Sequence, residues 1–194
     1  MIKSIDFYFD FISPYSYLAH KEIKTLKEKK NIIFNYKPIL VGGLHNLQGI
    51  TAPAFIKAKL KYMISDCNLI AEKNNFAFMW NSKFPINSLN IMRGYLYLND
   101  ETKGFYLNVI FDAYWKGGLD TSNEKILETL LNKCEINTND FFDGIKDPKI
   151  KDKLKAVTQE AHDKEIFGAP TFVVNNKIFW GQDRLGFALD EYNK

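Results

Sequence analysis

The sequence is poor in cysteine: Cys67 and Cys134 are the two cysteines among 194 residues, and they lie far apart along the chain. No Cys-x-x-Cys motif occurs, which excludes dithiol exchange through such a motif. Each cysteine falls on the apolar face of an expected helix, which favours a buried free thiol; a catalytic thiol is the alternative. We expect no structural disulfide.

Long hydrophobic runs are also absent. No stretch approaches the roughly 18 consecutive apolar residues of a transmembrane helix, and residues 1–4 lead directly into a strand-like pattern without a secretory segment. We therefore expect a cytoplasmic protein with no membrane partner.

Histidines are few, and phosphate-binding glycine motifs are missing. His20, His45 and His162 show no metal-ligand spacing, and neither G-x-G-x-x-G nor a P-loop occurs. We expect no metal, flavin or nucleotide. The net charge is only +3, and the basic run at residues 27–30 falls at an expected helix end, where cations favour the helix dipole. A binding patch is the alternative, but we expect no nucleic-acid partner.

The sequence does contain enough apolar residues, 46%, for a substantial core. Apolar and polar residues alternate over residues 5–12, which predicts a strand. Ser13 and Pro14 are typical of a helix start, and residues 31–39 predict a second strand. These elements form a β-α-β unit with parallel strands and a right-handed crossover.

Helical patterns dominate the middle of the chain. Residues 42–53 begin with Gly42 and Gly43 and predict a long loop. A capping box is expected at residues 121–124, and Gly168 is expected to end the last of these helices. Strands at 171–174 and 177–180 predict a hairpin around Asn175 and Asn176, and a final helix follows. The predicted helices of the middle cover residues 56–71, 88–98, 106–114, 124–134, 137–145 and 148–167.

The start of the first helix is the most informative segment for function. Free backbone N–H groups and the helix dipole favour an anion there, and the Ser13 hydroxyl can donate a hydrogen bond. Together these could lower the pKa of a bound thiol by about one to two units. The alternative is that Ser13 is an ordinary helix cap.

Two later segments allow two interpretations each. Pro170, directly before a strand, suits a cis bond that exposes the backbone of Ala169 to a peptide-like ligand; a simple helix-to-strand boundary is the alternative. Asp183 could bind the ammonium group of a ligand, or it could be the N-cap of the last helix.

Taken together, the segments FDFISPYSYLA, FGAPTF and FWGQDRL resemble a known family. The order of elements resembles that of the DsbA-like branch of the thioredoxin superfamily. In that branch a Cys-x-x-Cys motif opens the first helix, and in this chain Ser13 and Ser16 stand at the two cysteine positions. The serine version is similar to 2-hydroxychromene-2-carboxylate isomerase and to the related kappa-class glutathione transferase. The resemblance also includes residues 38–43, 58–63 and 84–87.

This resemblance implies an α/β, thioredoxin-like fold with a large all-helical insertion. The thioredoxin-like domain would comprise residues 1–45 and 168–194, and the insertion residues 46–167. Glutathione would be the cofactor of an isomerase, adding its thiolate reversibly to a small aromatic carboxylate. The protein would be a homodimer.

The resemblance also implies residue roles. Ser13 would activate the glutathione sulfur, and a cis Pro170 would follow the pairing residue Ala169. The sequence departs from the family at Ile50, where an asparagine is common, and at His45, which falls near the position of a carboxylate-binding lysine. The implied glutathione-binding residues are Pro14, Tyr15, Ala169, Pro170, Gly181, Gln182 and Asp183, and the implied substrate-binding residues are His45, Asn46, Lys59 and Asn87.

Two alternatives to the isomerase remain. A kappa-class-like glutathione transferase would use the same site but would leave glutathione attached to an electrophile. A non-catalytic thioredoxin-fold binding module is suggested by the loss of both cysteines.

Overall fold

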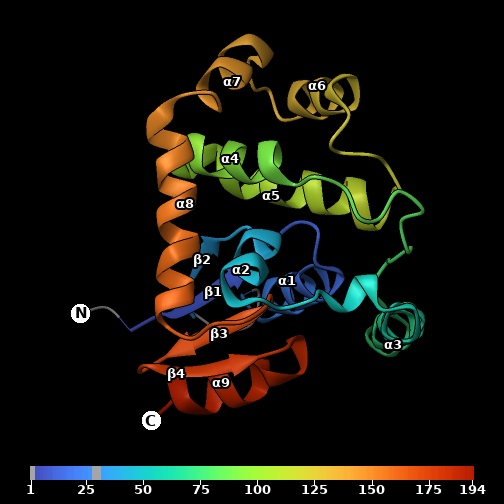
Figure 1. Cartoon of the computed structure of the whole chain (residues 1–194), viewed down its shortest axis with the longest axis vertical. Helices are drawn as coiled ribbons and strands as arrows, with labels where there is room; N and C mark the ends of the chain where they lie inside the picture. Colours follow the sequence, from blue (N-terminus) through green and yellow to red (C-terminus); the bar gives the residue numbers. More distant parts are fainter. Residues whose placement is uncertain (1–2, 28–31) are drawn as a thin grey trace.

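The computed structural model describes residues 3–27 and 32–194, and Figure 1 shows the arrangement of the chain. The elements follow in the order β1 (Ile5–Phe9), α1 (Pro14–Lys27), β2 (Phe34–Pro38), α2 (Val41–Gln48), η1 (Pro53–Phe55), α3 (Lys57–Asn74), α4 (Leu89–Tyr97), α5 (Asp100–Trp115), α6 (Glu124–Lys133), α7 (Thr138–Gly144), α8 (Pro148–Asp163), β3 (Thr171–Val174), β4 (Lys177–Trp180), η2 (Gln182–Arg184) and α9 (Leu185–Tyr192).

The strands form one mixed sheet in the order β2-β1-β3-β4. β1 runs parallel to β2 and antiparallel to β3, so that Phe7 lies opposite both Tyr36 and Phe172. The hairpin turn between β3 and β4 places Asn175 and Asn176 at positive φ, a conformation that asparagine tolerates well. The predicted thioredoxin-like order, β-α-β then helices then β-β-α, is confirmed.

Strand β1 is buried on both faces of the sheet. Phe7 and Phe9 belong to a large aromatic core that continues into the helical layer through Phe111. Tyr8 points to the opposite face and packs in a smaller cluster with Leu44 of α2. One short strand therefore anchors helices on both of its sides.

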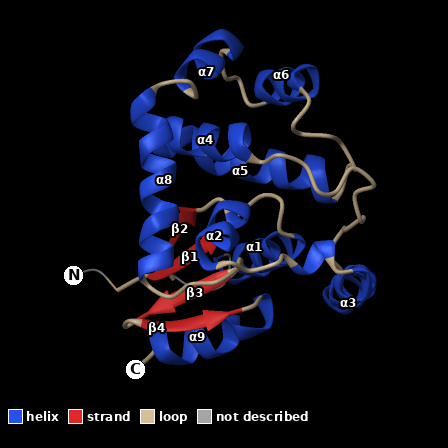
Figure 2. Cartoon of the chain, viewed as in Figure 1, coloured by secondary structure: helices blue, strands red, loops and turns tan. Residues whose placement is uncertain are grey.

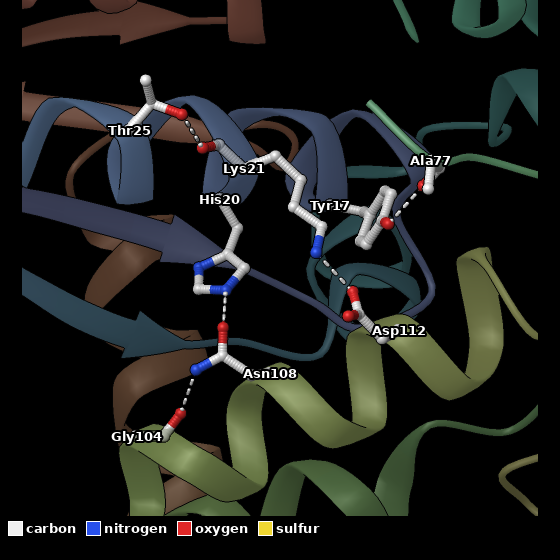
Figure 3. Close-up of polar contacts among 8 residues, drawn as sticks. All are labelled: Tyr17, His20, Lys21, Thr25, Ala77, Gly104, Asn108 and Asp112. Carbon is white, nitrogen blue, oxygen red and sulfur yellow. Dashed lines mark hydrogen bonds and ion pairs between the residues drawn. The ribbon is translucent and has the colours of Figure 1, made fainter. Parts of the chain in front are cut away.

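Polar contacts connect α1 to α5. The Lys21 ammonium donates to Asp112 at 2.5 Å, and the buried His20 ring contacts the Asn108 amide oxygen at 3.0 Å (Figure 3). The other ring nitrogen of His20 lies 2.8 Å from the Tyr36 hydroxyl of β2. These contacts join the first helix of the β-α-β unit to the helical layer.

The strands gather in one half of the molecule, and α4 to α7 occupy the other half (Figure 2). Helix α8 runs past both halves and contacts α2, α4 and β2. Within the described ranges, every helix is too short or too polar to span a bilayer.

The prediction of a loop over residues 42–53 was wrong, because α2 occupies most of this segment. The glycines lie in the first turn, where the Gly42 Cα faces open space, and Leu44 is fully buried. Gly49 ends the helix in the left-handed conformation at φ 66°. Burial of Leu44 and the glycine C-cap outweigh the low helix propensity of the two glycines.

Three boundaries also differ from the predictions. β1 ends at Phe9 rather than at residue 12, because the Ser13 N–H bonds the Asp10 carbonyl and turns the chain. Asn123, not Thr121, caps α6 by accepting from the backbone N–H of residues 125 and 126. α8 ends at Asp163, and Glu165 adopts positive φ there. The predicted strand residue at position 31 and the basic run from position 28 to position 30 lie outside the described residues.

Candidate active site

A cleft of about 1090 Å³ lies where the turn after β1 meets α2, α3, the start of α4 and the segment before β3. Most of its lining is apolar, with Ile12, Met63, Phe84 and Trp180 among the larger side chains. A pocket of this size suits a small organic ligand. The predicted site residues that line it are Ser13, Pro14, Tyr15, His45, Lys59, Asn87 and Ala169.

Ser13 lies at the start of α1 and is only 8% exposed. Its Oγ accepts from the Ser16 backbone N–H at 3.1 Å, which is the expected capping bond. The same hydroxyl donates to the Ala169 carbonyl at 2.8 Å. The structure therefore brings Ser13 and Ala169 into direct contact, although they are far apart in sequence.

The Ala169–Pro170 peptide bond is cis, as predicted. The Pro170 carbonyl accepts from the Gly181 N–H at 3.0 Å, which brings the segment after β4 next to the cleft. Gly168 does not end a helix; instead, a Cβ at this position would lie 2.7 Å from the Trp180 indole nitrogen. A larger residue at this position would have to displace the indole, which is half exposed and lines the cleft.

Gln182 and Asp183 lie outside the cleft lining, in the short η2 helix beyond Trp180. The Asp183 carboxylate is exposed and pairs with the Arg184 guanidinium at 2.9 Å. Asp183 is not the N-cap of α9, because that helix begins at Leu185 and has no side-chain cap bond. Its carboxylate remains accessible to a ligand that extends from the cleft.

The predicted substrate-binding residues lie in different surroundings. Burial lowers the pKa of His45, so its imidazole is neutral near pH 7; its buried Nδ1 has no hydrogen-bond partner among the described residues. Lys59 is exposed on α3 at the cleft lining, and the Asn87 amide oxygen accepts from the Leu89 N–H at 3.0 Å. Asn46 is exposed and is not part of the cleft lining.

Sequence reasoning missed Asp10, a buried carboxyl at the base of the cleft. Its Oδ1 accepts from the Ile12 N–H at 3.1 Å, and its Oδ2 from the Val41 N–H at 2.9 Å. The Ser88 hydroxyl also lowers the pKa of this carboxyl, yet burial dominates and raises the pKa of Asp10 to about 6. The available signal was an acidic residue at the end of an otherwise apolar strand, three residues before Ser13.

Tyr15, next to Ser13 in the lining, is oriented by α3. Its hydroxyl donates to the Asp66 carboxylate at 2.8 Å. Cys67 is adjacent and fully buried, and burial raises the pKa of its thiol to about 12. Cys134 is a buried free cysteine as well, so the prediction of two buried thiols is confirmed.

Comparisons with known proteins agree with this architecture. The family described as DSBA-like thioredoxin domain matches residues 4–193. The 2-hydroxychromene-2-carboxylate isomerase of Sphingobium xenophagum is 28% identical over 99% of this chain and 98% of its own. Glutathione S-transferase kappa 1 of Caenorhabditis elegans is 27% identical over 97% of this chain and 90% of its own. A solved structure of 2-hydroxychromene-2-carboxylate isomerase has a TM-score of 0.88 at 25% identity, covering 96% of this chain and 92% of that chain.

These matches extend over nearly the whole chain. They confirm the resemblance that the segments around Ser13, Pro170 and Asp183 predicted, and the names of the relatives support an isomerase enzyme. The chain belongs to the DSBA-like thioredoxin domain family.

Proposed function

We propose that the protein is a glutathione-dependent isomerase of the 2-hydroxychromene-2-carboxylate isomerase type. The observation that carries this proposal is the Ser13 hydroxyl at a helix N-terminus, inside a cleft and in contact with the Ala169 backbone. Glutathione would supply a thiolate that adds reversibly to an aromatic substrate. The protein residues would bind that thiolate and orient the substrate beside it.

Ser13 has one hydroxyl proton, and Ala169 accepts it in this structure. Rotation about one side-chain bond re-aims that proton into the cleft, while the Oγ atom remains within reach of the Ser16 N–H. A hydrogen bond to a charged acceptor contributes about 1.5–3 kcal/mol, which corresponds to one to two pKa units of the bound thiol. Ser13 therefore acts as a donor to a thiolate and not as a nucleophile.

The remainder of the cofactor would extend away from Ser13. The Ala169 backbone would pair with its cysteinyl part, and Gly181, Gln182 and Asp183 would hold its γ-glutamyl end. A γ-glutamyl ammonium group suits the exposed Asp183 carboxylate, which only one neighbouring guanidinium now pairs.

The aromatic substrate would occupy the apolar part of the cleft. His45, Lys59 and Asn87 contribute polar atoms to its lining, and Lys59 supplies a positive charge for a carboxylate. Asn46 would have to approach from outside the lining. A neutral His45 can donate or accept a hydrogen bond but supplies no charge.

The test is direct. Purified protein is mixed with glutathione and the chromene carboxylate, and conversion to the benzylidenepyruvate is followed by absorbance. We expect turnover that requires glutathione and leaves its concentration unchanged. Absence of any rate above background would reject the isomerase assignment.

A glutathione transferase is the second candidate, supported by the kappa-class relatives and by the neutral His45. Incubation with an aryl halide separates the two, because only a transferase consumes glutathione. A non-catalytic module would show neither reaction, and failure to bind glutathione in calorimetry would favour it. A homodimer is part of the proposal, and its test is the mass in solution by light scattering.

A further inference from the structure

Asp10 has no role in the proposed chemistry, yet it lies at the centre of the site. Its side chain is 1% exposed and lines the base of the cleft. It accepts hydrogen bonds from the turn before α1 and from the first residue of α2, and the hydroxyl of Ser88, which precedes α4, stabilises its charged form.

Each donor lies next to a residue of the candidate site. The Ile12 N–H precedes Ser13, and the Asp10 carbonyl also accepts from the Ser13 N–H at 3.0 Å. Val41 begins the helix that carries His45. Ser88 follows Asn87; its hydroxyl makes no cap bond to α4 and lowers the pKa of Asp10. The segments that carry Ser13, His45 and Asn87 therefore all lie next to the Asp10 carboxylate.

We propose that Asp10 is a positioning residue whose ionised carboxylate holds Ser13, His45 and Asn87 in one arrangement. The inference rests on the proposed function in treating these three residues as parts of one site. The carboxylate is suited to this task because an ionised carboxyl only accepts hydrogen bonds, and each of its two oxygens accepts one backbone N–H here. When the carboxyl is protonated, one of its oxygens carries a hydrogen. That oxygen then faces a neighbouring donor with a donor of its own, and the hydrogen bond between them is lost.

This arrangement predicts a pH dependence. Activity should fall as pH decreases through about 6, because protonation of Asp10 disrupts the set of acceptors. His45 is tested as well, because burial lowers its pKa from the ordinary value of 6.5 and its loss of charge also falls on the acidic side of neutrality. The ionisable groups that share the cleft with Asp10, or sense its charge, are Tyr15 on α1, His45 on α2, Lys59 and Tyr62 on α3, and Tyr114 on α5. The start of α4 and the segment before β3 present no ionisable lining residue.

The kinetic test compares Asp10→Asn with His45→Gln and with Asp6→Asn, the same substitution on the same strand outside the cleft. We expect Asp10→Asn to lower kcat/KM by about ten- to a hundredfold at pH 7.5, mainly through kcat, because a small displacement of reacting groups is costly. The acidic limb should disappear in Asp10→Asn and persist in the other two variants. Wild-type kinetics in Asp10→Asn, or an unchanged acidic limb, would overturn the proposal.

A second measurement does not depend on glutathione. In amide NMR spectra of the wild type, the Ile12 and Val41 N–H signals should titrate together with a midpoint near pH 6. In Asp10→Asn this common titration should be lost, and the amide signals of Ser13, His45 and Asn87 should shift; Asp6→Asn should move none of them. Independent titrations in the wild type would refute the role of Asp10 even if the enzyme is active. A wild type that neither binds nor uses glutathione would reject only the proposed function.

If Asp10→Asn does not fold, Ser88→Ala replaces it. Removal of the Ser88 hydroxyl should move the midpoint to higher pH, because this hydroxyl lowers the pKa of Asp10. An unmoved midpoint in this variant would contradict the proposal.

Discussion

Ser13 shows how one residue can serve both the fold and a site. Its Oγ atom caps α1, while its proton is donated to the Ala169 carbonyl, which also lines the cleft. The capping bond uses a lone pair and leaves the proton free for exchange between acceptors. Neither task requires a nearby base.

Substitution of Ser13 by alanine tests the donor role. In Ser13→Ala we expect the pKa of bound glutathione to rise by about one to two units and kcat/KM near neutral pH to fall by about ten- to a hundredfold. The ultraviolet absorbance of the bound thiolate, followed against pH, gives the first quantity. Ser16→Ala is the matched control, because its buried Oγ atom has no hydrogen-bond partner among the described residues. Equal behaviour of the two variants would exclude the donor role.

Single residues were predictable from the sequence where local geometry decides their role. Ser-Pro marks a helix start, and a proline before a strand suggested the cis bond; both agree with the structure. Asp10 was not predictable, because its partners at residues 41 and 88 meet it only after the chain has folded. The roles assigned to Gln182 and Asp183 remain predictions.

Among the elements, α2 shows the limit of local propensity. Two glycines predict a loop, but the helix is stabilised by tertiary contacts of Leu44 and by the Asp10 carboxylate at its first N–H. Strongly periodic helices such as α6 were predicted correctly, because a continuous apolar face carries the information locally. Helix ends depend on individual caps and were less predictable.

Packing between α4 and its neighbours gives a test at this scale. A Cβ at Gly94 would lie 2.6 Å from the Tyr106 hydroxyl of α5 and closer still to the Phe141 ring of α7. We expect Gly94→Ala to lower the free energy of unfolding by about 1–3 kcal/mol, as overpacking commonly does. Urea unfolding measures the change.

Gly104→Ala is the control for this experiment. Gly104 lies in α5 with no atom within 4 Å of an added Cβ. Alanine should raise the free energy of unfolding there by about 0.5–1 kcal/mol, because it lowers the entropic cost of forming the helix. A gain in stability at both sites would show that the close approach of α4 is not a constraint.

For the whole molecule, the division into a sheet and a helical insertion followed from the order of the elements. The contact of α8 with both halves could not be predicted from that order, because it depends on tertiary packing between distant segments. The same holds for His20, which joins α1 to β2 and α5 and which the sequence analysis placed in no site.

His20 predicts how stability changes with pH. Burial lowers its pKa to about 4 from an ordinary value near 6.5. Since the unfolded chain binds the proton more readily, His20 lowers the free energy of unfolding by about 3 kcal/mol as pH falls from about 6.5 to 4. Asp10 has the opposite effect because its pKa is raised to about 6: it increases the free energy of unfolding as pH falls from about 6 to 3.8, the ordinary pKa of an aspartate.

The test therefore compares the free energy of unfolding of the wild type with that of His20→Gln at each pH. The deficit of the variant in urea unfolding should be largest near pH 7 and should shrink by about 3 kcal/mol at pH 4. A deficit of His20→Gln that is constant with pH would refute the linkage.

The two cysteines have a consequence for the conditions in which the protein can operate. Cys67 and Cys134 are buried, and burial raises their pKa values to about 12 and about 11, so almost no thiolate forms at neutral pH. Peroxides react with thiolates much faster than with thiols. The chain should therefore keep its structure during oxidative stress. Under the proposed function, loss of activity would then reflect the state of the cell's glutathione pool and not damage to the protein.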